Sequence, residues 1–345
     1  MAKRLAWVGL GLVLLVLGFA VDALARAGEF KTLSARPLEC RKVSGVIGPE
    51  DITVDPVRQV AYIAASDARS MLKQRAASGG LYRYALGDAA PTLLYASAQN
   101  DFHPHGISYW SDGNGPDLLF AVNHATNTVH SIELFEVTAA GLRHVSTLRD
   151  PLLVSPNDIV AVGRHEFYVT NDHAQNRGVG QLIDDVLRRE RAQILHVRDG
   201  KFRIVASDLA YANGINRAHA GATIYVAEPA RMRMRTYARA FDTGNLTLQQ
   251  TLPLGTGADN IEVDAEGRLY IGAHPKLFTF MRHAVDASVA APSQVIRVAQ
   301  GKIASLYVNL GDELAASTVA APIAEHLLIG SVFADHFLDC KLPRL

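Results

Sequence analysis

A short polar motif recurs six times along this chain at intervals of 46 to 58 residues, and each copy leads into an Ile or a Val. A second apolar stretch follows each copy, as Ala61-Tyr62-Ile63 follows the first. The copies are Glu50-Asp51-Ile52, His105-Gly106-Ile107, Asn157-Asp158-Ile159, Asn213-Gly214-Ile215, Asp259-Asn260-Ile261 and Ser317-Thr318-Val319. Repeats of roughly 40–50 residues with several strands each are typical of β-propellers. The sequence therefore predicts an all-β fold, a six-bladed β-propeller with one blade for each motif.

The length and charge of the chain narrow its organisation and its partners. A propeller closes its blades into one ring, so we expect residues 37–345 to form a single domain. The 34 Lys and Arg residues balance the 34 Asp and Glu residues, which leaves a formal net charge of zero. This balance does not favour nucleic acid as a partner, and we expect a small molecule instead.

The N-terminus has the pattern of an export signal. Lys3 and Arg4 precede residues 5–21, a stretch that carries no charge. The stretch is long for the core of a cleaved signal and short for a membrane span. Residues 1–25 are therefore either a signal peptide, removed at Ala23-Leu24-Ala25, or a retained anchor that associates with a membrane through residues 5–21. In both cases we expect the folded domain in the periplasm or outside the cell.

The chain has two cysteines, Cys40 and Cys340, close to the two ends of the predicted ring. A propeller must join its first and last blades, and a disulfide at this place would lock that seam. An exported domain meets the oxidising conditions in which disulfides persist. The alternative is a pair of unrelated buried thiols.

Two charged segments stand out from the pattern of apolar strands. In residues 181–192, apolar residues recur at helical spacing with charged residues on the other side. We expect a helix inserted in the third blade, which either covers one mouth of the channel or lies solvated on the surface.

Four arginines share one face of a predicted strand: Arg231, Arg233, Arg235 and Arg239. A charged outer edge that discourages edge-to-edge pairing accounts for them better than an anion site does.

The polar residues of the six motifs predict a metal site on the propeller axis. Innermost strands run along that axis, so equivalent positions of different blades converge. Carboxylate and amide oxygens are the ligands of hard cations such as calcium, and the lack of thiolates disfavours zinc. The predicted ligands are Glu50, Asn157, Asn213, Asp259 and Asn260. His105 lies on the same ring as a candidate base, and the alternative is a polar channel that binds only water.

Two doublets of adjacent polar residues, Glu50-Asp51 and Asn157-Asp158, predict a second site. Neighbouring residues of a strand point to opposite sides, so Asp51 and Asp158 face away from the first ion. We expect them to hold a structural cation together with backbone carbonyls.

At these motifs the chain resembles the serum paraoxonase/arylesterase family, six-bladed propellers with calcium-dependent lactonase and arylesterase activity. The resemblance extends from Cys40 to Cys340. The motifs that carry it are Gly48-Pro49-Glu50-Asp51, Phe102-His103-Pro104-His105-Gly106-Ile107-Ser108, Val122-Asn123-His124, Pro156-Asn157-Asp158-Ile159, Thr170-Asn171-Asp172-His173, Ala212-Asn213-Gly214-Ile215-Asn216, Asp259-Asn260-Ile261 and Gly272-Ala273-His274-Pro275.

The resemblance implies two calcium ions for each chain. It assigns the five predicted ligands to a catalytic calcium, and it assigns Asp51, Asp158 and the backbone carbonyl of Ile107 to a structural calcium. It also implies that His105 and His124 form a histidine dyad, that Cys40 and Cys340 form a disulfide, and that the N-terminal segment is kept as an anchor.

The chain departs from the family at three places. Ala273 replaces a free cysteine of the family, which excludes a thiol role. The insert at 181–192 is charged where animal members carry an apolar segment, and the loop 66–80 also differs. Substrate preference and any lipoprotein-like partner are therefore not carried over from the family.

These observations predict hydrolysis of a lactone ester bond. A calcium ion would polarise the carbonyl oxygen, and His105 would take a proton from the attacking water while His124 orients it. Glu50 is a competing base, whereas His103 and His274 are expected to be structural hydrogen-bonding groups or pocket walls.

Three alternatives remain at this stage. The first is an arylesterase or phosphotriesterase whose lactone activity is secondary. The second is a non-catalytic propeller that binds a ligand or a protein, with calcium as a structural pin. The third is a condensing enzyme similar to the strictosidine-synthase-like propellers, which the paired calcium ligands disfavour.

Overall fold

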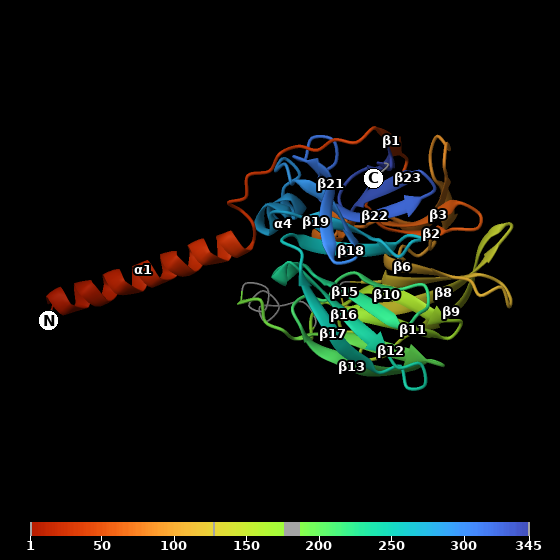
Figure 1. Cartoon of the computed structure of the whole chain (residues 1–345), viewed down its shortest axis with the longest axis horizontal. Coiled ribbons are helices and arrows are strands. Elements are labelled where there is room, and N and C mark those ends of the chain that lie inside the picture. The colour runs from red at the N-terminus through yellow and green to blue at the C-terminus, as the bar shows by residue number, and fades with distance from the viewer. Residues whose placement is uncertain (1, 127, 176–186, 344–345) are drawn as a thin grey trace.

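The computed structural model describes residues 2–126, 128–175 and 187–343. Six four-stranded sheets stand around a common axis, and a long helix extends away from them (Figure 1). All the strand pairs within the sheets are antiparallel, as between β2 and β3 (Pro49–Asp55 and Val60–Ser66). The predicted six-bladed β-propeller is confirmed.

In the first three blades the strands follow chain order from the axis outward. Blade 1 contains β2 (Pro49–Asp55), β3 (Val60–Ser66), β4 (Gly79–Ala85) and β5 (Thr92–Tyr95). Blade 2 contains β6 (Pro104–Trp110), β7 (Leu118–His124), β8 (His130–Thr138) and β9 (Gly141–Leu148). Blade 3 contains β10 (Pro156–Gly163), β11 (Glu166–Asn171), β12 (Ala192–Arg198) and β13 (Lys201–Leu209).

Blades 4 and 5 follow the same chain order, whereas blade 6 takes its outermost strand from the N-terminal end of the chain. Blade 4 contains β14 (Ile215–Arg217), β15 (Thr223–Glu228), β16 (Arg233–Arg239) and β17 (Leu246–Pro253). Blade 5 contains β18 (Gly257–Val263), β19 (Leu269–His274), β20 (Ser293–Ala299) and β21 (Lys302–Asn309). Blade 6 contains β22 (Ser317–Ile323), β23 (His326–Ser331), β24 (His336–Lys341) and β1 (Cys40–Ser44).

Apolar side chains pack between neighbouring blades and hold the ring together. Ile52 of blade 1 packs with Val319 and Phe337 of blade 6, and all three are fully buried. Phe120 of blade 2 and Phe167 of blade 3 pack in a corresponding cluster, with 5.4 Å between their ring centroids. Burying such a side chain contributes about 1.5–3 kcal/mol. This packing brings the first strands of neighbouring blades into contact around the axis.

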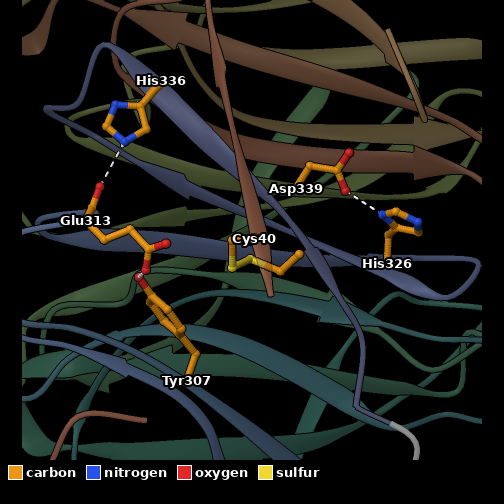
Figure 2. Close-up of a disulfide and its surroundings, with 7 residues drawn as sticks. Cys40, Tyr307, Glu313, His326, His336 and Asp339 are labelled. Atoms are coloured by element: carbon orange, nitrogen blue, oxygen red, sulfur yellow. Dashed lines mark hydrogen bonds and ion pairs between the residues drawn. A yellow bond between two sulfur atoms is a disulfide. The ribbon is translucent and has the colours of Figure 1, made fainter. Parts of the chain in front are cut away.

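A disulfide closes the ring in blade 6. Cys40 of β1 lies opposite Cys340 of β24, and their sulfurs are bonded (Figure 2). Asp339, next to Cys340, accepts hydrogen bonds from His326 Nδ1 at 2.5 Å and from the Tyr84 hydroxyl of blade 1 at 2.7 Å. The predicted disulfide is therefore confirmed, and polar contacts support the same seam.

Helix α1 (Ala2–Arg26) precedes the ring and projects from it (Figure 1). Most of its described apolar side chains are exposed, including Trp7 at 72% and Leu15 at 73%. In the part of the chain whose side chains the structure describes, no helix is long and apolar enough to cross a membrane.

The residues after α1 fasten the N-terminal segment to helix α4 (Leu277–Val285) of blade 5. Ala27 accepts a backbone hydrogen bond from Leu277. Glu29 accepts hydrogen bonds from the backbone N–H groups of Phe278 and Thr279, at 2.8 and 3.1 Å, and from the Thr279 hydroxyl. A carboxylate at the start of a helix satisfies its free N–H groups and its dipole, so Glu29 caps α4.

Two further helical segments of the described residues are short. They are α2 (Ala68–Leu72), in the loop after β3, and the 3₁₀ helix η1 (Pro229–Arg231) before β16. Of the predicted insert at 181–192, residues 181–186 lie outside the described residues, and β12 already begins at Ala192.

The interpretation of the arginine strand as an outer edge is wrong. Strand β16 lies between β15 and β17. Arg233 and Arg235 both bind the carboxylate of Glu228, which is fully buried. These arginines therefore neutralise a buried charge inside the blade.

Candidate metal and active site

The predicted ligand residues meet where the first strands of the blades begin. Asn260 of blade 5 donates from Nδ2 to Glu50 Oε1 of blade 1 at 2.8 Å. His105 Nδ1 of blade 2 lies 3.8 Å from Glu50 Oε2 and donates to the backbone carbonyl of Asn157 at 2.9 Å. Asn213 precedes β14, and its backbone carbonyl accepts a hydrogen bond from Thr170 of blade 3. Residues from five blades are thus arranged around one end of the axis.

Four buried oxygens of this set have no hydrogen-bond partner among the described residues. They are Glu50 Oε2, Asn157 Oδ1, Asn213 Oδ1 and Asn260 Oδ1. A buried acceptor without a partner costs about 1–3 kcal/mol. One carboxylate and three amide oxygens are hard ligands of the kind that calcium binds. The residues therefore fit a hard cation, which would satisfy all four oxygens at once.

The donor set differs from that of a transition metal. Within residues 2–126, 128–175 and 187–343, no group of three or more His, Cys, Asp or Glu side chains is placed to hold a metal ion. The set instead combines two carboxylates, Glu50 and Asp259, with three amides. Such a mixture favours a hard cation over zinc.

The second predicted pair, Asp51 and Asp158, is bonded in another way. Asp51 accepts hydrogen bonds from the backbone N–H groups of Ile52 and Ile107, at 2.9 and 2.7 Å. Asp158 accepts them from Ile159 and Ile215, each at 2.7 Å. Asp51 therefore links blade 1 to blade 2, and Asp158 links blade 3 to blade 4.

Gly106 allows Asp158 to approach blade 2 closely. A Cβ atom at Gly106 would lie only 2.3 Å from Asp158 Oδ1 and 2.4 Å from Asp158 Cα. No side chain fits at that distance. The position of Asp158 therefore requires a glycine at residue 106.

Burial disfavours the charged form of these carboxylates. Burial raises the pKa of Glu50, and the neighbouring Asp259 raises it further, whereas His105 opposes the change. Burial and the charge of Glu50 raise the pKa of Asp51 to about 8. Burial and the charge of Asp51 hold the pKa of Asp158 well above its usual range. A bound cation would supply the positive charge that these acids lack.

His105 has the geometry of a base. Its Nδ1 donates to a backbone carbonyl, so the neutral ring keeps its lone pair on Nε2. Its side chain is 26% exposed, although most of the surrounding ring is buried. Burial lowers the pKa of His105, but Glu50 and the carbonyl of Asn157 outweigh it, and the pKa is raised.

A second histidine beside His105 is held by a third that the sequence analysis missed. The ring centroids of His105 and His124 are 5.3 Å apart. His124 Nδ1 lies 2.8 Å from Nδ1 of His130, which stands opposite it in the β7–β8 pairing. The register of this hairpin is the signal that identifies His130.

Two further residues orient the predicted ligands. His274 Nε2 donates to Asp259 Oδ2 at 2.7 Å, and its ring stacks on Phe280 of α4 with 3.8 Å between centroids. Asp172 accepts a long hydrogen bond of 3.5 Å from Asn157 Nδ2. His103 lies deeper and bonds to the backbone carbonyl of His124 at 2.8 Å. Asp172 belongs to a motif noted in the sequence, but its role as a neighbour of Asn157 was not predicted.

Comparison with known proteins identifies the family. The profile of the family described as Arylesterase matches residues 93–342. Human serum paraoxonase/arylesterase 1 is 32% identical over 364 residues, covering 99% of this chain and 100% of the relative. Mouse serum paraoxonase/lactonase 3 is 30% identical over 243 residues, covering 68% of each chain.

A solved structure shows the same fold. The calcium-binding protein regucalcin from Agrobacterium tumefaciens matches with a TM-score of 0.55 and 15% identity, covering 91% of this chain and 98% of that one. At this identity the likeness concerns the fold alone. The family profile and the sequence relatives show that the chain belongs to the serum paraoxonase/arylesterase family and is an ester-hydrolysing enzyme.

Proposed function

We propose that this enzyme hydrolyses lactones in a calcium-dependent reaction, with arylesterase activity on the side. The observation that carries the proposal is the set of four buried oxygens without partners, one from Glu50 and three from asparagines. The name of the mouse relative, a lactonase, supports a cyclic ester as the substrate class. Residues 37–345 form the hydrolase domain in this proposal.

The proposal assigns two calcium ions. Glu50, Asn157, Asn213, Asp259 and Asn260 hold the catalytic ion. Asp51, Asp158 and the backbone carbonyl of Ile107 hold the structural ion. The catalytic ion supplies a Lewis acid for the carbonyl oxygen of the ester.

The histidines of blade 2 move the proton. His105 Nε2 takes a proton from the water that adds to the carbonyl carbon, and Nδ1 stays bonded to Asn157. The proton then returns to the ring oxygen as the C–O bond breaks, which leaves a hydroxy acid. His124, held by His130, orients His105 or relays the proton. Glu50 is the competing base, since its Oε2 lies 3.8 Å from the same imidazole.

The test compares an aliphatic δ-lactone with phenyl acetate, each with calcium and with excess EGTA. We expect turnover that requires calcium and a higher kcat/KM for the lactone. Turnover of both esters at full rate in EGTA would contradict the proposal. A lactone rate far below the phenyl acetate rate would favour the second candidate, an arylesterase or phosphotriesterase, of which the family description supports the arylesterase.

We also propose that the enzyme is exported. The disulfide between Cys40 and Cys340 is consistent with an oxidising compartment. Residues 1–25 serve as a cleaved signal or as a retained anchor. If they are retained, the exposed apolar side chains of α1 support association of residues 5–21 with a membrane. The mass of the mature protein and its distribution between soluble and membrane fractions distinguish the two. An uncleaved protein found in the cytoplasm would contradict export.

A further inference from the structure

A narrow cavity lined by arginines adjoins the candidate site between blades 3 and 4. Its lining includes Asp172, His173 and Tyr211 together with Arg188, Arg189 and Arg191. Its volume is about 10 Å³, which is room for one water-sized group. Asp172 also contacts Asn157, so only one side chain separates this cavity from a predicted ligand of the catalytic metal.

Arg188 is the residue of this cavity that lacks an acceptor. Its Nη2 is buried and has no hydrogen-bond partner within the described part of the chain. Arg231 lies behind it and donates from Nη2 to its backbone carbonyl at 3.1 Å. Burial lowers the pKa of Arg188, and the positive charges of Arg231 and Arg26 lower it further. A buried guanidinium N–H without an acceptor is unfavourable, and a second guanidinium beside it adds repulsion.

The nearby acids are already engaged with other groups. Glu190 contacts Arg231, Arg233 and Arg235 at 3.4, 3.0 and 3.7 Å. The carboxylate of Asp172 accepts hydrogen bonds from His173 and from Ser155.

The remaining acids are engaged too. Asp22 forms an ion pair with Arg26 at 2.8 Å. Glu228 holds Arg233 and Arg235. The described acids around Arg188 therefore leave its positive charge for a ligand.

We propose that Arg188, with Arg231 behind it, forms a subsite for a carboxylate carried on the tail of the substrate. The preferred substrates are then lactones with a second, anionic group a short distance from the ring. A guanidinium N–H binds a carboxylate oxygen in a charge-assisted hydrogen bond, and the cavity has room for one such oxygen. This inference rests on the proposed lactonase function and adds the chemistry of the substrate tail.

The test uses two δ-lactones with side chains of equal length, one ending in a methyl group and one in a carboxylate. For the wild-type enzyme we expect kcat/KM to favour the carboxylated lactone by roughly 10–100-fold, as a charge-assisted hydrogen bond would give. Arg188→Gln should bring this ratio close to one, and Arg188→Lys should restore part of it. Arg143→Gln is the matched control, since Arg143 is an exposed arginine paired with Glu136 in blade 2, and it should keep the wild-type ratio.

Two outcomes would overturn the subsite. In one, the wild-type enzyme shows no preference for the carboxylated lactone. In the other, Arg188→Gln lowers both rates equally and leaves the ratio unchanged, as a structural role would. If neither lactone is hydrolysed, the proposed function fails and calorimetry decides on the subsite. The wild-type protein should then bind the ring-opened dicarboxylate more tightly than the monocarboxylate, and Arg188→Gln should not. Equal affinities of the wild-type protein would overturn it.

Discussion

Two pairs of carboxylates lie on the first strands of the blades, yet their surroundings differ. Glu50 and Asp259 are bonded to side chains, Asn260 and His274, and Glu50 Oε2 has no hydrogen-bond partner in the described structure. Asp51 and Asp158 accept two backbone N–H groups each, from their own and a neighbouring blade. We call the first pair with its asparagines the upper layer, and the second pair the lower layer.

The difference teaches how one set of strands serves two purposes. The lower layer joins blades through the backbone, so a cation there would strengthen contacts that already exist. The upper layer is held by side chains and keeps buried oxygens that have no hydrogen-bond partner among the described residues. Oxygens without hydrogen-bond partners, beside a partly exposed histidine, suit a catalytic role. Oxygens that already accept backbone hydrogen bonds suit a stabilising role.

The largest effect is expected from the base beside the upper layer. His105→Gln should reduce lactone turnover by roughly 10²–10⁴-fold, as the loss of a general base does, with an unchanged melting temperature. His326→Gln is the control, because His326 lies at the disulfide seam and is not part of either layer (Figure 2). Retention of full activity by His105→Gln would transfer the role of base to Glu50.

A ligand of the upper layer should affect rate more than stability. Asp259→Asn keeps an oxygen for His274 but removes a charge, and we expect turnover to fall by at least roughly 10²-fold, as on losing transition-state electrostatic stabilisation. The melting temperature in calcium should change little. Steady-state kinetics and thermal unfolding of the same sample measure both. A wild-type rate in this variant would remove the upper layer from catalysis.

The lower layer should show the opposite pattern. Asp158→Asn should lower the free energy of unfolding in excess calcium by about 2–4 kcal/mol, the linkage expected from calcium present at roughly 100 to 1,000 times its Kd. The same substitution in metal-stripped protein should destabilise it less, because there only one of the two backbone N–H groups that bond to Asp158 loses its acceptor. Denaturant unfolding of wild-type and Asp158→Asn protein, with and without calcium, measures the destabilisation under each condition. Equal destabilisation in both conditions would show that Asp158 acts only through its backbone hydrogen bonds.

The pH dependence of metal-stripped protein sharpens the comparison further. The pKa of Asp51 is about 8 in the folded protein, well above the ordinary value of 3.8, so the folded state binds a proton more readily than the unfolded state between these values. This contribution to stability is complete below pH 3.8 and is lost as the pH rises through 8. Between pH 8.5 and 5.5, wild-type protein should therefore gain at least about 1 kcal/mol relative to Asp51→Asn.

The comparison with Asp51→Asn cancels the titration of the histidines. Melting curves of both proteins in buffers freed of calcium with a chelating resin provide the measurement. A constant difference between the two proteins across this pH range would mean that Asp51 is charged and accommodated without a cation.

The repeat made the fold predictable from sequence. Six motifs with matching Ile or Val residues predicted six blades, and Cys40 and Cys340 predicted the closure that β1 and β24 provide. Membership of an ester-hydrolysing family sets aside the non-catalytic propeller and the condensing enzyme. These features follow from local patterns or from positions at the ends of the chain.

Other parts of the site depend on contacts between segments that are far apart. His130 meets His124 only through the register of a hairpin, and Glu29 reaches α4 across most of the sequence. The arginines of β16 were assigned to an edge because Glu228, which they neutralise, lies on the preceding strand and bears no pattern of its own. Periodicity shows which residues share a face of a strand, but it does not show which residues pack against that face.

A calcium titration of metal-stripped protein, with turnover and thermal stability followed in the same samples, tests the two-layer account most directly. The account predicts two binding events per chain, of which one raises the melting temperature and the other switches on lactone hydrolysis. Asp158→Asn should remove the first event and Asp259→Asn the second. A single event, or full activity before any calcium is added, would contradict the account.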